Sequence, residues 1–112
     1  MTNIKWPFGA LKSVALTATG AQAITISGQM TVIDGATVQA TGNRTINLTI
    51  NTNVEAGAVI FIKNKTAATE TTTYGTGITS AVTTGVAGKT ITQLFVYDGT
   101  AFLAAGAQQQ ID

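Results

Sequence analysis

The sequence contains no cysteine and no histidine, and only 10% of its 112 residues are charged. Without cysteine there can be no disulfide framework and no thiolate metal site. Without histidine the chain lacks the side chain that most often acts as a general acid or base near neutral pH. We therefore expect a non-enzymatic protein with no catalytic residues, no bound metal and no cofactor.

The basic residues are too few and too scattered to form a nucleic-acid-binding surface. Six Lys and Arg residues give a formal net charge of +1, and only Lys63 and Lys65 lie close together. Because phosphate backbones are bound by clustered basic side chains, nucleic acid is not an expected partner. The longest apolar run, residues 56–62, is far shorter than the about 20 residues that a helix needs to cross a bilayer, so membrane insertion is not expected either.

From residue 13 onward, apolar and polar residues alternate in short runs that glycines interrupt. In residues 44–51, for example, Ile46, Leu48 and Ile50 would face one side of a strand. No window has the 3.6-residue period of a helix. The pattern predicts an all-β domain over residues 12–106, an antiparallel β-sandwich or jelly roll of about eight to ten short strands. The expected core positions are Val14, Leu16, Ile24, Ile26, Ile46, Leu48, Ile50, Ile60, Ile62, Leu94, Val96 and Phe102.

Two dipeptides, Asp34-Gly35 and Asp98-Gly99, predict tight hairpins, because Asp and Gly both tolerate the backbone angles of such turns. Two other segments, residues 58–62 and 93–97, are apolar on both faces of the expected strand. A strand of that kind is central or covered on its second side. Since the mean hydropathy of +0.29 is high for so few charges, we expect the surplus apolar face to contact another copy in a homo-oligomer, in particular a homotrimer.

Two polar loops could be taken for ligand sites. Gly88-Lys89-Thr90 ends like a phosphate-binding loop, but Thr83 stands where that motif needs glycine, and a strand pattern follows instead of a helix. This favours a simple turn. Asn51, Asn53 and Glu55 could supply oxygen ligands to a metal, although their spacing is not that of a calcium loop.

Tyr74 and Tyr97 are the expected exposed aromatic rings, since Phe61, Phe95 and Phe102 lie within apolar alternation typical of a core. Exposed rings beside Asn and Thr side chains can stack on sugars. Tyr74 and Tyr97 are therefore possible ligand contacts, and a host surface glycan is a possible partner.

The two ends of the chain differ from the middle. Residues 1–11 are aperiodic and carry the single Trp and the single Pro. We interpret this segment as an arm in which Ile4, Trp6, Pro7 and Phe8 anchor the protein to a partner, because large aromatic side chains dominate interface energies. The alternative is that the arm packs back onto its own domain. Residues 107–112 form a polar tail that we expect to extend outward or to cap the assembly.

The order of features from Asn43 to Gln110 resembles that of a known group of proteins. A Thr-Ile-Asn-Leu-Thr-Ile strand is followed by Ala56-Gly57, an apolar strand ending Ile62-Lys63-Asn64, Thr73-Tyr74-Gly75, and finally Val96-Tyr97-Asp98-Gly99. This resembles small all-β bacteriophage virion proteins, particularly capsid decoration proteins and head or tail fibres. The resemblance implies a structural protein, commonly trimeric, on the capsid surface, bound to a major capsid or other virion protein and made in the bacterial host cytoplasm. The alternative role is a carbohydrate- or receptor-binding module at a fibre tip.

Overall fold

The computed structural model describes residues 12–112, which form eleven strands and no helix. The strands are β1 (Lys12–Ala15), β2 (Gly20–Ile26), β3 (Met30–Ala40), β4 (Arg44–Ile50), β5 (Val59–Thr66), β6 (Thr71–Tyr74), β7 (Ile78–Thr79), β8 (Thr83–Thr84), β9 (Thr90–Tyr97), β10 (Phe102–Ala104) and β11 (Gln109–Gln110). The predicted all-β class is confirmed.

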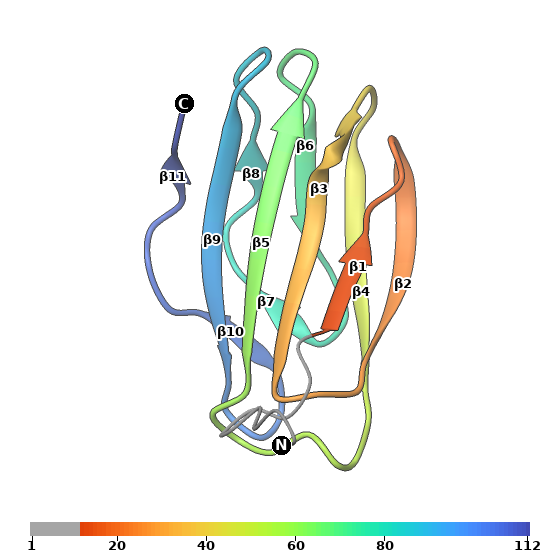
Figure 1. The fold of residues 1–112 in the computed structure, drawn as a ribbon, viewed down its shortest axis with the longest axis vertical. Helices are drawn as coiled ribbons and strands as arrows, with labels where there is room; N and C mark the ends of the chain where they lie inside the picture. Colours follow the sequence, from red (N-terminus) through yellow and green to blue (C-terminus); the bar gives the residue numbers. More distant parts are fainter. Residues whose placement is uncertain (1–11) are drawn as a thin grey trace, which may run out of the picture.

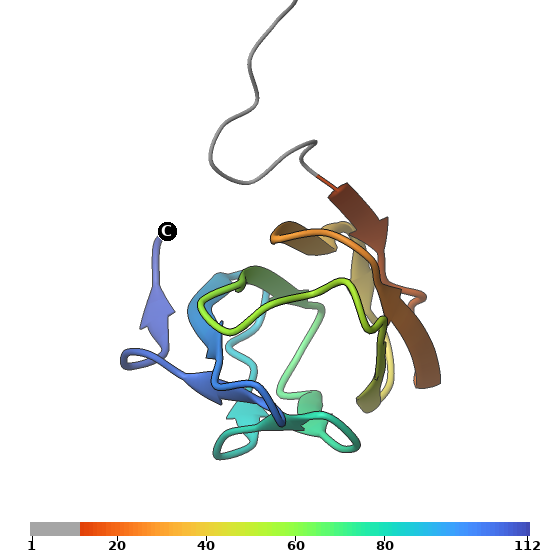
Figure 2. The ribbon, with the colours of Figure 1, turned by 90° about the horizontal axis from the view of Figure 1, so that it is seen from below.

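The strands form two sheets that enclose one core (Figures 1 and 2). The large sheet has the order β1-β3-β5-β9-β10-β7, with β11 paired to β9 beside that path. The small sheet has the order β2-β4-β6-β8. The sandwich-like arrangement is also confirmed, and β5 is a central strand between β3 and β9, as its two apolar faces predicted.

The direction of pairing differs from the predicted antiparallel arrangement. From β1 to β6 the chain alternates between the two sheets, so that β1, β3 and β5 are parallel neighbours, as are β2, β4 and β6. Antiparallel pairs appear only where β8, β9, β10 and β11 join the sheets. The prediction was wrong here because a glycine-rich break fits a crossing to the opposite sheet as well as a reversal beside the previous strand.

The core is built by the side chains that each strand points between the two sheets. Ile26, Ile46, Ile60, Ile62, Phe95 and Phe102 are fully buried in it, while Val14 and Ile50 are partly buried at its margin. Leu94 and Val96 were expected there, but this is wrong: Leu94 is 43% exposed, and Phe95 between them is buried. Both faces of β9 are apolar, so periodicity alone could not decide which face points inward.

The two Asp-Gly dipeptides have different structures. Asp98-Gly99 makes the predicted hairpin between β9 and β10, with Gly99 at a φ of 100° and the Asp98 carboxylate accepting hydrogen bonds from the N–H groups of Thr100 and Ala101. Asp34-Gly35 does not make a hairpin, because β3 continues through it. It opens a bulge instead: from Gly35 to Ala40 the strand advances five residues while β5 advances two, from Asn64 to Thr66.

Two polar segments are integrated into the sheets. The Thr-rich residues 66–74 contain β6, which lies between β4 and β8. The C-terminal tail does not extend outward, because β11 pairs with β9 and the Asp112 carboxylate accepts hydrogen bonds from the N–H and hydroxyl of Thr90. The backbone N–H of Thr90 would otherwise lack a partner at the edge of β9.

Candidate interaction face

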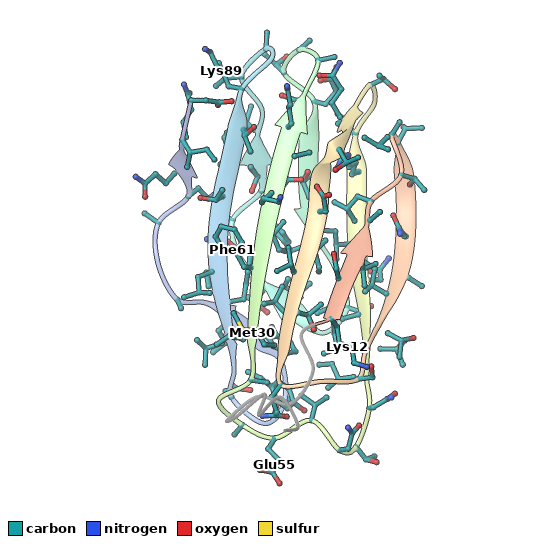
Figure 3. All side chains as sticks on the ribbon, in the orientation of Figure 1. Lys12, Met30, Glu55, Phe61 and Lys89 are labelled. Atoms are coloured by element: carbon teal, nitrogen blue, oxygen red, sulfur yellow. The ribbon has the colours of Figure 1, made fainter. Side chains whose placement is uncertain are left out.

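The outward side of the large sheet carries a continuous group of apolar side chains. Successive residues of a strand point to opposite faces, so the buried Ile60 and Phe95 place their neighbours Val59, Phe61 and Leu94 on the outside. We call this surface the apolar face and define it as Met30, Val32, Val59, Phe61, Leu94, Val96 and Leu103. Figure 3 shows Met30 and Phe61 on the neighbouring strands β3 and β5.

The strand register arranges these side chains in two adjacent rows. One row runs through Met30, Val59, Val96 and Leu103 on β3, β5, β9 and β10. The second runs through Val32, Phe61 and Leu94. Three inter-strand spacings of about 4.8 Å make the first row roughly 14 Å wide. Leu94 and Leu103 are 43% and 41% exposed, so the face presents substantial apolar surface to solvent.

The apolar face ends where the same strands become polar. In the next outward row, Asp34 lies opposite Lys63 of β5 in the strand register, and Lys63 lies opposite Thr92 of β9. Hydrogen bonds from Thr37 and Ala36 lower the pKa of Asp34 to about 2, and the charge of Lys63 contributes in the same direction. The outward side of the small sheet differs throughout, because its rows consist of Ala, Thr and Asn side chains. Leu94 and Leu103 thus lie with the partly buried members of the apolar face at one end of the large sheet, whereas the other exposed large apolar side chains, Val38, Val82, Val86 and Ile111, lie elsewhere.

The two tyrosines proposed as ligand contacts do not form a common site. Tyr74 was expected to be exposed, which is wrong: the residue is 9% exposed, and its ring centroid lies 5.3 Å from that of Phe95. Its hydroxyl shares a 2.6 Å hydrogen bond with the hydroxyl of Thr83 on β8, and burial raises the pKa of Tyr74. Tyr97 is half-buried and stacks on Phe102 with ring centroids 4.9 Å apart.

Acidic side chains of the described region are used to satisfy backbone N–H groups. Hydrogen bonds from Ala101 and Thr100 lower the pKa of Asp98, and one from Thr90 lowers that of Asp112. Within residues 12–112 there is no cluster of three or more Asp, Glu, His or Cys side chains suited to hold a metal ion. The amide of Asn53 donates to the carbonyl of Ser27, which gives this residue a loop-closing role.

The loop that ends in Gly88-Lys89-Thr90 leads directly into β9. Gly88 donates its N–H to the carbonyl of Thr66 and adopts a φ of 70°. The turn interpretation of this loop is therefore confirmed, since a phosphate-binding loop would have to open a helix.

The proposed anchor residues Ile4, Trp6, Pro7 and Phe8 lie outside the described residues, so their role stays a prediction. The apolar face was foreseen only in part. The sequence indicated a surplus apolar side on residues 58–62 and 93–97, but it did not show that Met30, Val32 and Leu103 join it. Met30 and Val32 belong to β3, which pairs with β5 about 29 residues further along the chain, whereas Leu103 follows the Asp98-Gly99 hairpin and lies opposite Val96.

No protein-family model, curated protein or solved structure matches the chain. None of the described residues forms a helix long and apolar enough to cross a membrane.

Proposed function

We propose that the protein is a non-enzymatic structural component of a bacteriophage virion, where it decorates the capsid surface or forms a short spike or fibre on it. The proposal combines the sequence resemblance with one structural observation, the apolar face. An isolated sandwich needs to cover only the inner side of each sheet. Seven apolar side chains on the outer side of one sheet are therefore best explained by contact with another protein subunit.

In this proposal the apolar face joins copies of the chain into a homotrimer, while residues 1–11 bind a major capsid or other virion protein. The two roles are separate because the apolar face belongs to the folded sandwich and the arm precedes it. The rival glycan-binding role keeps little support, since Tyr74 is buried and leaves Tyr97 as a single half-buried ring. Glycan-array binding that is lost in Tyr97→Ala would nevertheless favour that role over the structural one.

The role of the apolar face is tested by light scattering on the purified chain at micromolar concentration. The wild-type protein should be oligomeric, and Leu94→Asp combined with Leu103→Asp should abolish the trimer while the chain stays folded, because both side chains are more than 40% exposed and their replacement leaves the core intact. Thr49→Asp, on the exposed side of the small sheet, is the matched control and should leave the oligomer unchanged. A monomeric wild type would refute the role of the apolar face.

The virion role needs a separate experiment. Purified particles should contain the protein in fixed stoichiometry, and a variant lacking residues 1–8 should fold and form the oligomer but no longer attach to particles. Attachment that is unchanged by the deletion would refute the anchoring role of the arm. Absence of the protein from purified particles would refute the virion role itself.

A further inference from the structure

The small sheet ends in a strand whose outer edge differs from the other sheet margins. β2 pairs with β4 on one side, and within residues 12–112 it has no neighbour on the other. It lies at the right-hand margin of the molecule in Figure 1. The other edge strands are shorter. β7 and β8 have only two residues each, and β1 has four residues and begins with the charged Lys12. Such short or charged margins discourage pairing with another chain.

β2 lacks these protective features. Its seven residues, Gly-Ala-Gln-Ala-Ile-Thr-Ile, contain no charge and no proline. Its register with β4 is continuous from Gly20 to Ile26, so no bulge twists the edge away. A regular, uncharged edge of this length is a ready template for another strand.

The backbone groups of β2 that point away from β4 can be identified from the hydrogen bonds at its two ends. Gly20 donates its N–H to Asn43, and Ile26 accepts from the N–H of Asn51, so both point toward β4. Because the backbone groups of successive strand residues point to alternating sides, those of Ala21, Ala23 and Thr25 point away from β4. The side chains of these three residues are small and exposed on the outward side of the sheet, where they leave room for a neighbouring strand.

We propose that β2 pairs with β2 of a second copy in an antiparallel, two-fold symmetric contact centred on Ala23. In this register Ala23 faces its own counterpart, and Ala21 faces Thr25 of the other copy. Each copy supplies the donors that the other copy's acceptors need. No like charges meet, because the strand has none. The two small sheets then form one continuous sheet across the dimer.

The side of β2 that faces the core is already fixed in one copy. Ile24 is buried, and the Gln22 side chain accepts a hydrogen bond from the N–H of Thr17 and donates one to the carbonyl of Ala15. Pairing therefore adds backbone hydrogen bonds without rearranging the core, and we expect the contact to form without a conformational change. The contact is independent of the apolar face and can fail or succeed separately from it.

Cysteine cross-linking of the full-length chain tests both the contact and its register, because the natural sequence has no cysteine. Facing residues in such a pair have Cα atoms about 5.5 Å apart, within the range that a disulfide spans. Ala23→Cys alone should therefore form a disulfide-linked dimer under mild oxidation. Ala21→Cys alone and Thr25→Cys alone should not, since identical residues would lie about 14 Å apart, but an equimolar mixture of these two variants should cross-link.

The competing outcomes are distinguishable. Equal cross-linking of all three single variants would indicate random collision and overturn the proposal. Absence of cross-linking in Ala23→Cys would also overturn it. If deletion of residues 1–8 restored the cross-link, the chain's own arm would be identified as the occupant of the edge instead of a second copy.

A charge variant provides a second measurement. Ala23→Lys places two like charges opposite each other at the two-fold axis and should abolish the β2 contact while the exposed position leaves folding unaffected. Thr73→Lys, an exposed position on the same side of the small sheet two strands away, is the matched control and should leave the contact intact. Equal behaviour of the two variants in sedimentation velocity would overturn the proposal.

Discussion

Both terminal nitrogens of Arg44 donate hydrogen bonds to the carbonyl oxygen of Gly35, and each bond is 3.2 Å long. The second nitrogen also donates to the carbonyls of Val38 and Lys65, at 2.9 and 3.3 Å. The guanidinium thus fills the bulge of β3 and ties it to β5. The side chain is only 3% exposed, and this burial lowers the pKa of Arg44. The planar fork of arginine matches such divergent acceptors better than the single ammonium of lysine.

Replacing Arg44 should destabilise the fold through the bulge. In Arg44→Met the three carbonyls lose a charged donor, which we expect to lower the free energy of unfolding by about 2–4 kcal/mol. Arg44→Lys should lose about as much, because a lysine cannot reach all three acceptors. Urea denaturation measures both values. Wild-type stability in Arg44→Lys would show that charge alone, without the fork, is sufficient.

Gly35 is needed because of this close approach and not because of a turn. A Cβ atom at this position would lie 2.7 Å from the carbonyl oxygen of Lys63, a backbone atom that cannot move aside, and would also collide with the Arg44 guanidinium. Gly35→Ala should therefore lower the free energy of unfolding by about 1–3 kcal/mol. Gly106→Ala is the matched control, since a Cβ there would meet no atom within 4 Å. Equal urea midpoints for the two variants would contradict this explanation.

Asp34 makes the stability of the bulge dependent on pH. Its pKa is lowered from 3.8 to about 2, chiefly by the hydrogen bond from the Thr37 hydroxyl and by those from the N–H groups of Ala36 and Thr37. A group with a depressed pKa in the folded state stabilises the fold above its ordinary pKa, and that contribution is lost as the pH falls through the folded value. Thermal midpoints of the wild type should therefore drop between about pH 4 and pH 2. The drop should be smaller in Asp34→Asn and unchanged in the exposed loop variant Glu55→Gln.

Tyr74 belongs to a buried polar network that joins the two sheets. Its hydroxyl contacts Thr83 at 2.6 Å and accepts a longer bond from Asn64 of the large sheet. Tyr74→Phe leaves the buried Thr83 hydroxyl without this partner and should cost about 1–2 kcal/mol of unfolding free energy. Tyr97→Phe removes only an exposed bond to the carbonyl of Gly99 and should cost less than about 0.5 kcal/mol. Comparable losses in the two variants would contradict the importance of the network.

The sequence predicted those features that depend on neighbouring residues. The strand that carries Ile46, Leu48 and Ile50 could be found from alternation alone, and so could the turn at Asp98-Gly99. The bulge at Asp34-Gly35 could not be predicted in this way. What distinguishes it from a hairpin is the guanidinium of Arg44, which extends from the next strand and binds the carbonyl of Gly35.

The inward side of β9 and the burial of Tyr74 depend in the same way on partners from distant strands. Parallel pairing between alternating sheets leaves no local signal, since each connection crosses to the other sheet before the next strand begins. The apolar face follows this rule. Its two central segments were visible in the sequence, but its extent depended on which strands became their neighbours.

Thr31 offers a test in which removing a polar group should stabilise the fold. This residue is 1% exposed beside Ile60 in the core, and its buried hydroxyl has no hydrogen-bond partner among residues 12–112. Thr31→Val keeps the shape of the side chain and removes the unsatisfied group, so we expect the free energy of unfolding to rise by about 1 kcal/mol. Thr72→Val is the matched control, because the equally buried Thr72 hydroxyl donates a 3.1 Å bond to Asn64 and its loss should cost about 1 kcal/mol or more. Opposite shifts of the urea midpoint would confirm the assignment of satisfied and unsatisfied hydroxyls, whereas destabilisation by both variants would show that Thr31 has a partner.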